Sequence, residues 1–540
     1  MVLATLAHWV LNEPHLALFA VIVFLGWIYR DRPLFVSRCD HIKGPKGLPL
    51  LGNTLQVFKD VANPLQAMLA RSKTYGLPNT MTVVGMGRAI NVTRPDWIQH
   101  IQKTRFNNYV KGPKLHECLH DLLGDGIFNA DGHTWKAQRK VGSNIMTISN
   151  LKNLVSHVLD AQSQRFCNVL QQASEQGKAI DLQAAFFDLT IQTFLNIAFT
   201  TDLDSVQPTN GPGDDQEGEE LSFADAFDLA QQLSVRRINN PWWRLTRRWS
   251  ADEKALQGAI RKIDHCIYAL IDRRSKASEV ASEAKNGSQL DLLDLFLTYR
   301  DEHGQPLTPR QLRDALLNYL LAGRDTTAES LSWASFELLQ HPTAIEELRS
   351  EVAEHSIRFG DAAIDHENSE DNQRSSSFDF GHTKQLHRVK AIYHESLRLH
   401  PSVPRSSKIS LGDDVLPGGI FVPKGTTVIW SDWLLARNHD VWGADASEWK
   451  FERWLDREGR FFSESPWKFH AFNGGPRTCL GIQLAQFQGM YILARLFSEF
   501  DLELESDRGT HYKPEVENTL TLPMKQPLMV RAYPRKFRAA

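Results

Sequence analysis

Cys479 stands in a local sequence that a core-filling cysteine would not need. It lies in FNGGPRTCLGIQLA, Phe472 to Ala485, close to three glycines and two residues after Arg477. A thiolate can ligate a metal or attack a substrate, and both uses require its negative charge to be stabilised. The residues after Cys479 begin an apolar helical pattern, and the N-terminus of a helix favours an anion. Because glycine also lets the backbone approach a flat ligand closely, the pattern predicts a chemically active cysteine.

The choice between a ligand and a nucleophile depends on a neighbouring base. A cysteine nucleophile needs a histidine within reach, and His470 is the nearest one in the sequence. His470 stands across the glycine turn from Cys479, and no residue beside it is suited to orient its ring. The ligand role is therefore favoured.

A second group of chemically capable residues lies inside a long apolar helical pattern. Thr308, Pro309 and Gln311 predict a capping box at its start, and Pro342 predicts its end. The segment AGRDTT, residues 322–327, stands in the middle of this pattern. Glycine in a helix interior costs about 1 kcal/mol relative to alanine, and buried polar groups need hydrogen-bond partners. Such residues indicate a function or a kink stabilised by a capped threonine.

Two further patterns carry charged pairs that are weak signals when each is taken alone. Glu395 and Arg398 in HESLRLHPSVPR are three residues apart on one helix face, as are pairs on many exposed helices. Trp135 and Arg139 in WKAQR are four apart, and both side chains offer N–H donors. An ordinary exposed cationic helix would also explain WKAQR.

Taken together, these motifs resemble the cytochrome P450 family. Phe472-x-x-Gly475-x-Arg477-x-Cys479-x-Gly481 is similar to its haem-binding loop, and the long helix, HESLRLHPSVPR, WKFERWLD and WKAQR match further family motifs. The resemblance covers nearly the whole chain after the N-terminal segment. It implies a mainly α fold with a small β part, the cytochrome P450 fold, preceded by a membrane anchor helix.

The resemblance implies a role for each motif residue. Haem b would be bound through Cys479 as the axial thiolate, and without a covalent link, because Ala322 stands where animal relatives carry a glutamate. Residues implied to bind the haem are Phe472 against the loop, Trp135, Arg139 and Arg477 at the propionates, and Lys408, where some members place a further propionate partner. Residues implied to act in dioxygen activation are Gly323, which permits a local helix opening, Thr326, which hydrogen-bonds dioxygen, and Asp325, which admits protons. Residues implied to form a structural cluster are Glu395, Arg398 and Arg453.

The substrate is less well determined by the sequence. The side chains expected around the pocket are all apolar: Phe128, Leu321, Ala322, Val403 and Leu520. The stretches NNYVKG, LLGDGIFNADG and AGRDTTA are similar to fungal and plant enzymes that hydroxylate alkanes and fatty acids. A fungal oxidase that tailors a polyketide or terpenoid shares every motif and stays open as an alternative. An isomerase that rearranges peroxides, or a haem carrier, is disfavoured, because neither needs the Asp325-Thr326 pair.

Composition restricts the partners. The chain has 540 residues, a formal net charge of -3 and no basic stripe, so nucleic-acid binding is not expected. Five cysteines without a CxxC pair indicate neither a disulfide framework nor a structural zinc site, and they fit a reducing compartment. Gly85 and Gly87 fit a hairpin within residues 79–95 better than a dinucleotide fingerprint. Electrons for the reaction with O2 must then come from an NADPH–cytochrome P450 reductase, with Lys136 and Lys140 expected in its docking surface.

The N-terminal segment predicts contact with a membrane. Leu16 to Tyr29 carries no charge, and Arg30 and Arg32 follow it; a span needs about 20 residues, so the run is short. We expect a signal-anchor rather than a buried core helix, with the bulk of the chain facing the cytosol by the positive-inside rule. The predicted organisation is an anchor at 1–37, a Pro/Gly-rich hinge at 38–53 and a haem domain at 54–540, held single-pass in the endoplasmic reticulum membrane.

Three other segments carry smaller predictions. The acidic stretches Thr209 to Glu220 and His366 to Ser377 are expected to be surface loops, because they hold few large apolar groups. Asn239 to Trp249, with its tryptophans beside arginines, fits a membrane interface. A helix–helix loop with the tryptophans packed inward fits it equally well.

Overall fold

The computed structural model describes residues 14–37, 39, 41–145, 148–200, 221–240, 242–280, 291–300, 303–359, 376–505, 514–517 and 519–535. The chain divides into two units. The first consists of Met1–Gly112, Arg236–Arg248 and Arg405–Leu434, and the second of Pro113–Val235, Trp249–Pro404 and Leu435–Ala540. Most of the regular structure is helical, with small sheets in each unit, as the sequence predicts.

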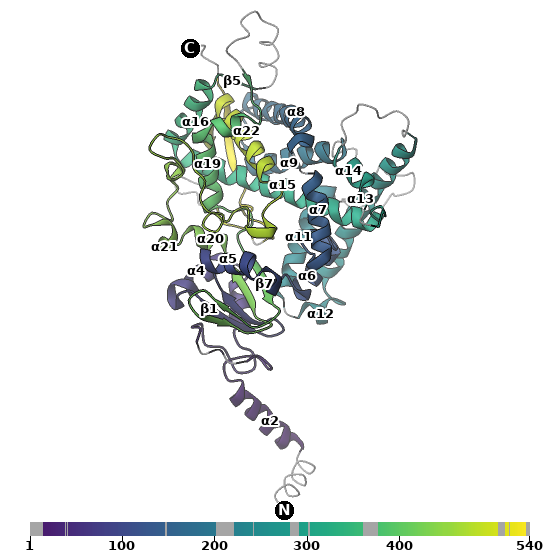
Figure 1. Ribbon diagram of the computed structural model, residues 1–540, viewed down its shortest axis with the longest axis vertical. Helices are drawn as coiled ribbons and strands as arrows, with labels where there is room; N and C mark the ends of the chain where they lie inside the picture. The colour runs from purple at the N-terminus through teal and green to yellow at the C-terminus, as the bar shows by residue number, and fades with distance from the viewer. Residues whose placement is uncertain are drawn as a thin grey trace, which may run out of the picture. The chain divides into compact units, whose positions relative to one another are not determined.

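The second unit is built around one long helix, α15, Pro309–Gln340 (Figure 1). The predicted capping box is present: the Thr308 hydroxyl accepts from the Gln311 N–H, and the Gln311 side chain accepts from the Thr308 N–H at 2.9 Å. With 32 residues, α15 is about 48 Å long. Pro342 starts the next helix, α16, Pro342–Glu354. Helices α6, α9, α13, α19 and α22 all pack against α15, so it is buried on nearly every side.

Helix α9, Leu182–Phe199, is apolar around most of its circumference. Among the described residues it is the one helix long and apolar enough to cross a membrane, yet 67% of it is buried inside the protein. It packs against α15 and against α8, Ile148–Glu175. Its apolar character is therefore that of a core helix.

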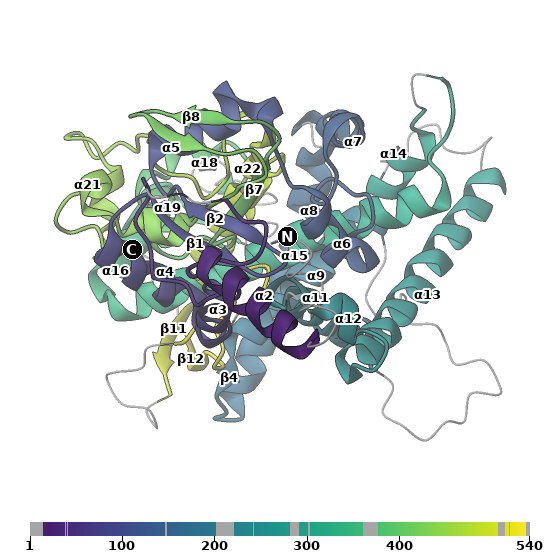
Figure 2. The ribbon, with the colours of Figure 1, turned by 90° about the horizontal axis from the view of Figure 1, so that it is seen from below.

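The first unit contains a five-stranded sheet in the order β1-β2-β10-β7-β3. Strands β1, β2 and β7 of this sheet are labelled in Figure 2. The hairpin predicted within residues 79–95 is confirmed, since β1, Asn79–Val83, pairs antiparallel with β2, Gly87–Asn91. Gly85 and Gly87 have φ of 73° and 80°, in the left-handed region that glycine enters without strain. Strand β10, Thr427–Trp430, continues the sheet parallel to β2 and antiparallel to β7, Ser406–Ser410.

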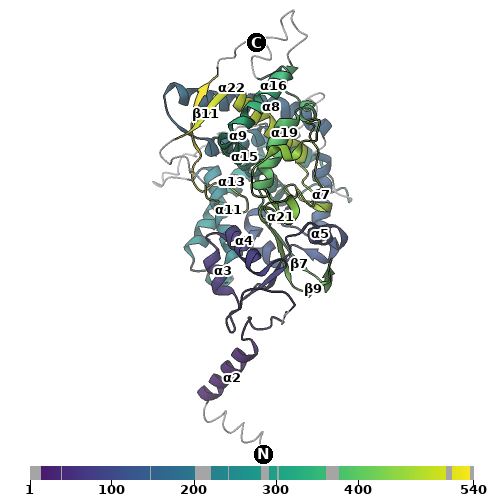
Figure 3. The ribbon, with the colours of Figure 1, turned by 90° about the vertical axis from the view of Figure 1, so that its left-hand side faces the viewer.

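The remaining elements complete the two units. In the first unit they are α2 Pro14–Ile28, α3 Thr54–Asp60, α4 Pro64–Tyr75, α5 Pro95–Gln99, η1 His100–Thr104, η2 Phe106–Asn108, β3 Tyr109–Val110, α12 Trp243–Thr246, β8 Asp414–Leu416 and β9 Ile420–Val422. In the second unit they are α6 Pro113–Leu123, α7 Gly132–Ile145, β4 Ile180–Asp181, α13 Ala251–Val280, α14 Leu292–Thr298, β5 Ile357–Arg358, β6 Ser376–Ser377, α18 His382–Gln385, α19 His387–Leu399, α21 His439–Trp442, η3 Phe451–Trp454, η4 Gly475–Arg477, α22 Ile482–Glu499, β11 Phe500–Leu504 and β12 Met529–Pro534. Residues of α11, Phe223–Asn239, and α20, Asp432–Ala436, belong partly to each. Figure 3 shows β11 beside the end of α22. Strand β11 belongs to a three-stranded sheet in the order β11-β12-β4.

The apolar N-terminal helix α2 has 15 residues and is about 22 Å long. That is shorter than the hydrocarbon core of a bilayer, about 30 Å. Its large side chains are exposed, with Phe19 at 66% and Trp27 at 70%, so the buried-core alternative for this segment is wrong. The predicted anchor also includes residues 1–13, which lie outside the described part of the chain.

The Pro/Gly-rich stretch from Lys43 to Asn53 forms no helix or strand, only isolated bridges. Glycine is required at three places, because a Cβ on Gly44 would lie 2.0 Å from the Thr80 carbonyl oxygen, one on Gly47 2.1 Å from that of Asp31, and one on Gly52 2.6 Å from that of Thr82. The backbone of this stretch therefore lies closer to the neighbouring chain than a residue with a Cβ atom would allow.

The three smaller predictions have different outcomes. Thr209 to Glu220 and residues 366–375 lie outside the described residues, and Ser376–Ser377 forms β6, paired with β5. In Asn239 to Trp249, where Pro241 is also outside the described residues, Trp243 is buried with the Arg237 guanidinium 4.8 Å from its ring. Trp242 and Trp249 are exposed at 41% and 79%, so the inward-packed alternative holds for Trp243 alone of these three.

Candidate active site

The loop that carries Cys479 is closed by its own backbone. The Cys479 N–H donates to the Phe472 carbonyl at 2.8 Å, and Gly475 has a φ of 63°. A Cβ on Gly474 would lie 2.5 Å from the Trp467 ring, so only glycine fits there. Gly481 is the N-cap of α22, which places Cys479 just before a helix N-terminus, as the sequence predicts.

Cys479 is an exposed residue, yet its sulfur is set among protein groups. The residue is exposed, while burial raises the pKa of its thiol and the Gly481 N–H and the Arg139 guanidinium lower it. Both observations fit a sulfur atom that the loop encloses on one side and leaves accessible on the other. A metal ion bonded to that open side would replace the proton as the partner of sulfur.

Helix α7 supplies the cationic residues next to this loop. Trp135 is buried, and the Arg139 Nη1 donates to the Thr478 carbonyl. The Arg477 guanidinium lies 4.4 Å from the Trp135 ring, and its Nη2 donates to Asp131 Oδ1 at 2.9 Å. The structure therefore brings together Trp135, Arg139, Arg477 and Cys479, and the role of the first three at the haem propionates stays a prediction.

These residues fit haem as the bound group. Burial lowers the pKa of Arg477 to about 10, although Asp131 opposes the shift, and a cation in such a place is stabilised by further negative charge. Arg477 Nε is buried without a hydrogen-bond acceptor among the described residues. An anionic side group of the ligand is the chemistry that this donor lacks.

The structure bears differently on two further residues that were predicted to contact the haem, Phe472 and Lys408. Phe472 is partly buried, with its ring 6.1 Å from that of Phe469, which agrees with the packing role expected for it. Lys408 lies in the first unit on β7, opposite Val428, and is buried. Its assignment to the propionates stays a prediction.

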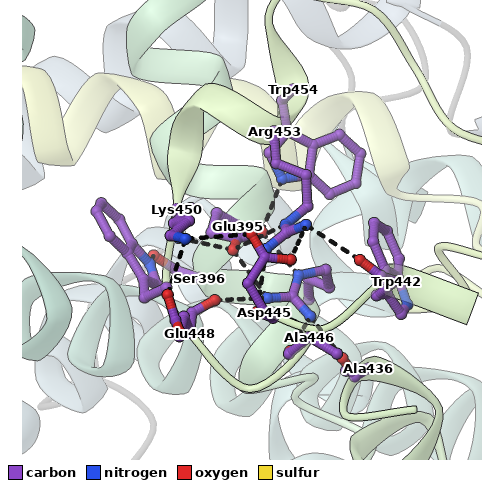
Figure 4. Close-up of polar contacts among 12 residues, drawn as sticks. Glu395, Ser396, Ala436, Trp442, Asp445, Ala446, Glu448, Lys450, Arg453 and Trp454 are labelled. Atoms are coloured by element: carbon purple, nitrogen blue, oxygen red, sulfur yellow. Dashed lines mark hydrogen bonds and ion pairs between the residues drawn. The ribbon is translucent and has the colours of Figure 1, made fainter. Parts of the chain in front are cut away.

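Glu395 on α19 is fully buried and receives hydrogen bonds from five donors (Figure 4). Arg398 binds it through two nitrogens at 2.7 and 2.8 Å, and the Arg453 Nε is more distant at 3.4 Å. The Lys450 N–H and the Trp454 indole N–H complete the set at 2.8 and 3.0 Å. The sequence identified the three charged members, but the backbone and indole donors carry no signal in a linear motif.

The two arginines extend this cluster into the chain that follows α20. Arg398 also donates to the carbonyl oxygens of Ala436, Ala446 and Glu448. Arg453 donates to the Trp442 carbonyl and to Asp445. Residues 436–454 have little regular structure of their own. The hydrogen bonds from Arg398 and Arg453 therefore fix the position of this segment.

The chemically capable segment of α15 is helical throughout. The Thr326 hydroxyl donates to the Ala322 carbonyl at 2.6 Å, and the Ser402 hydroxyl donates to the Thr326 carbonyl at 2.8 Å. A Cβ on Gly323 would lie 2.9 Å from the Phe194 ring of α9, so this glycine allows close helix packing. The expected opening of the helix at Gly323 stays a prediction.

Asp325 belongs to a charged network that the sequence reasoning missed. Arg324 donates to Asp325 at 3.0 Å and binds both oxygens of Asp228 on α11. Arg324 and Asp325 are buried, whereas the Asp228 side chain is 55% exposed. Burial raises the pKa of Asp325 to about 6, Arg324 lowers it and Asp228 raises it. The adjacent Arg324-Asp325 pair hinted at this network, but nothing in the sequence indicated Asp228 as its partner.

Glu329, one helical turn after Asp325, was also missed. It is buried, and it accepts a hydrogen bond from the Leu522 N–H at 2.9 Å. Burial and the nearby Asp325 raise its pKa well above the usual value. The only signal in the sequence was one further acid in an apolar helix.

The predicted pocket residues lie on α15 or on loops that are hydrogen-bonded to it. Phe128 donates its N–H to Asn318 at 3.0 Å, Ser402 beside Val403 binds Thr326, and Leu522 near Leu520 binds Glu329. Leu321 is buried, Ala322 and Leu520 are half-buried, and Phe128 and Val403 are exposed at 36% and 40%. Three separate loops thus attach to α15 within residues 318–329.

Comparison with known proteins agrees with this arrangement. Residues 42–530 match the family model described as Cytochrome P450. Cytochrome P450 monooxygenase cyp1 from Mycosarcoma maydis is 38% identical over 531 residues, 96% of this chain and 80% of that protein. Cytochrome P450 86B1 from Arabidopsis thaliana is 35% identical over 440 residues, 81% of this chain and 75% of that protein. Cytochrome P450 704B1 from the same plant is 32% identical over 494 residues, 87% of this chain and 91% of that protein.

The resemblance to fungal and plant members is therefore confirmed. The family binds a thiolate-ligated haem and reacts with O2 using electrons from a reductase. With the match over most of its length and a cysteine loop, cationic contacts and buried acid in the arrangement described, the chain belongs to the cytochrome P450 family and is a cytochrome P450 monooxygenase.

Proposed function

We propose that this monooxygenase hydroxylates C–H bonds of a hydrophobic long-chain substrate, a fatty acid or an alkane. The observation that carries the proposal is the apolar set Phe128, Leu321, Ala322, Val403 and Leu520, whose loops attach to α15 around Thr326. The charged groups of this segment are paired, because Arg324 binds both Asp325 and Asp228. The similarity of the AGRDTTA segment to fungal and plant hydroxylases of chain ends points the same way.

The chain's own residues would divide the chemistry among them. Cys479 would hold the haem, which would supply the redox chemistry of the reaction with dioxygen. The Gly481 N–H supports the negative charge on sulfur, and Arg477 and Arg139 hold anionic side groups. With its pKa raised to about 6, the Asp325 carboxyl group would take up and release a proton close to neutral pH, and the Thr326 hydroxyl would be the next group to pass it on. Asp228, exposed at the other side of Arg324, links this acid to solvent.

The proposed substrate class is tested by spectral titration of the purified enzyme. Fatty acids and alkanes of increasing length are expected to shift the haem from low to high spin, with affinity rising as about 0.8 kcal/mol per buried CH₂. Phe128→Ala and Val403→Ala should each weaken this binding about tenfold, whereas Val415→Ala, which changes an exposed residue of β8 in the first unit, should not. A shift with polyketide- or terpenoid-like compounds and none with linear chains would contradict the proposal.

We further propose contact with a membrane. The exposed apolar side chains of α2 and the exposed Trp242 and Leu245 beside Arg244 support it, because amphipathic aromatic and basic residues favour the bilayer interface. The arginines after α2 favour a single-pass orientation with the rest of the chain in the cytosol, in the endoplasmic reticulum membrane.

The electron donor is proposed to be an NADPH–cytochrome P450 reductase that docks on α7. Lys136 and Lys140 are exposed there, while Trp135 and Arg139 of the same helix turn toward the cysteine loop. Lys136→Glu and Lys140→Glu should raise the KM for reductase with an unchanged haem spectrum, and Lys178→Glu, an exposed control after α8, should not. An unchanged KM in both α7 variants would exclude this docking surface.

A further inference from the structure

We propose that His116, His120 and Asp125 form a second metal site, which binds one divalent transition-metal ion such as Zn²⁺ at the surface. It uses none of the residues of the cysteine loop. Among the described residues, these three are the group of histidine and acidic side chains whose ligand atoms all lie within 4.8 Å of one another. No cysteine pair marks this site in the sequence.

The three ligand atoms converge on one point. His116 and His120 are four residues apart on α6, so their rings share one helix face, with centroids 5.0 Å apart. Asp125 Oδ1 lies 2.9 Å from His116 Nε2 and 4.0 Å from His120 Nδ1. Ligands of a tetrahedral zinc ion, each about 2 Å from it, stand about 3.3 Å apart. Small rotations of the side chains would bring both distances to that value.

One of these ligand atoms has no other use in the protein. His120 Nδ1 is buried and has no hydrogen-bond partner among the described residues. A buried polar atom without a partner is unfavourable. A metal ion beside Asp125 would satisfy it.

The acidic ligand is held in place by α15. The Asp125 N–H donates to Asp314 at 3.0 Å, and Asn129 of the same loop donates to the His116 and Gly124 carbonyl oxygens, each at 2.9 Å. A Cβ on Gly124 would lie 2.1 Å from Asp314, so the loop packs tightly on α15. Such support from outside the ligand set orients a metal ligand in advance.

The ligand types select the class of ion. Two imidazoles and one carboxylate suit zinc, copper or nickel, whereas calcium and magnesium prefer oxygen alone. The side chains of His116, His120 and Asp125 are 35%, 32% and 56% exposed, which leaves room for a water molecule as fourth ligand.

Arg310 competes with the metal. Its Nη2 lies 2.9 Å from His120 Nε2, and because arginine only donates, this bond places the ring proton on Nδ1. Binding through Nδ1 moves that proton to Nε2 and releases Arg310. Since Arg310 is exposed, it can move without loss of packing. Removing it should therefore tighten metal binding.

The test is calorimetric titration of Zn²⁺ into the full-length holoenzyme, purified without a polyhistidine tag and dialysed against chelator. We expect one saturable site that is at least about tenfold weaker in His116→Ala, His120→Ala and Asp125→Asn, because the loss of even a residue that only orients a metal ligand weakens binding by about 10- to 100-fold. His439→Ala, which changes an exposed histidine on α21, serves as the control and should bind as the native protein does. Arg310→Gln should bind several-fold more tightly, and Ca²⁺ should not bind.

Two further readouts keep the outcome interpretable. An unchanged carbon monoxide spectrum in each variant shows that it is folded, and zinc-edge X-ray absorption should report two imidazole ligands. Zinc binding that is absent, or that is equal in the His116→Ala, His120→Ala and control variants, would overturn the proposal.

Discussion

At the scale of single residues, the fold raises the pKa of Asp325 toward neutral pH, which suits a group that transfers protons. A carboxyl group with a pKa raised to about 6 exchanges protons near neutral pH, which an ordinary aspartate does not. Burial is the main cause, and Arg324 and Asp228 act against each other around it. The pKa of Asp325 thus depends on Arg324 and Asp228, and each of these can be substituted separately.

These neighbours predict opposite shifts in the pH dependence of turnover. Because we propose the protonated carboxyl group of Asp325 as the proton donor, turnover should fall as pH rises through the pKa of Asp325. Arg324→Gln removes a charge that lowers this pKa, so the fall should move to higher pH; Asp228→Asn removes a charge that raises it, so the fall should move to lower pH. Product formation with saturating reductase measures both.

Asp325→Asn is the control for this pair. It should lose the pH-dependent fall and about 10²-fold of the rate, the size of a typical acid–base contribution. Retention of the same pH dependence in Asp325→Asn would show that another group delivers the proton.

Glu329 makes a prediction about stability. Its raised pKa means that the folded state keeps the proton to a higher pH than the unfolded state does. The free energy of unfolding should therefore fall as pH rises above the usual glutamate pKa, until the pKa of the folded state is reached. Glu329→Gln keeps an acceptor for the Leu522 N–H and cannot ionise, so this part of the pH dependence should disappear. Denaturant titrations of both proteins across that range measure it, and identical slopes would contradict the argument.

At the scale of elements, the buried cluster around Glu395 explains how irregular chain holds a defined position. Residues 436–454 carry short elements, yet Arg398 binds three of their carbonyl groups while Glu395 binds Arg398, Arg453 and two N–H groups. The carboxylate thus connects α19 to a long segment of backbone. Removing one partner of a buried charge pair costs about 3–5 kcal/mol.

The two arginines of this cluster are expected to differ in importance. Glu395→Ala and Arg398→Lys should yield protein without haem, because Arg398 is fully buried with bonds at 2.7 and 2.8 Å to the carboxylate. Arg453→Lys should retain part of the haem, because Arg453 is 13% exposed and 3.4 Å from Glu395. Haem content per protein, measured after purification, checks the order. A haem-free Arg453→Lys beside a haem-loaded Arg398→Lys would reverse it.

Elements also show where sequence reasoning succeeds and where it stops. The capping box at Thr308, the hairpin at Gly85 and Gly87, and the helix start after Cys479 were predictable, because local spacing alone determines them. The Arg324–Asp228 bond and the Lys450 and Trp454 donors to Glu395 were not, because they join residues far apart in the chain. Burial of Trp243 but not Trp242 likewise depends on packing that no local pattern contains.

At the scale of the whole molecule, the family match and the apolar N-terminal helix predict a membrane-bound enzyme. The full chain should remain in the membrane pellet after carbonate extraction, and a chain that begins at Arg30 should be released in larger part. Residual binding of the shorter chain should fall further in Trp242→Ser, since Trp242 is exposed beside α12. Full extraction of the complete chain would exclude the anchor.

The central claim for the whole molecule is that the sulfur of Cys479 is the axial ligand of the haem iron. The most direct measurement is the carbon monoxide difference spectrum of the reduced, purified protein and of Cys479→His. The native protein should show the Soret maximum of a thiolate-ligated haem, and Cys479→His should show that of an imidazole-ligated haem or contain none. A native spectrum of the imidazole type, or a thiolate spectrum that survives the substitution, would contradict the account.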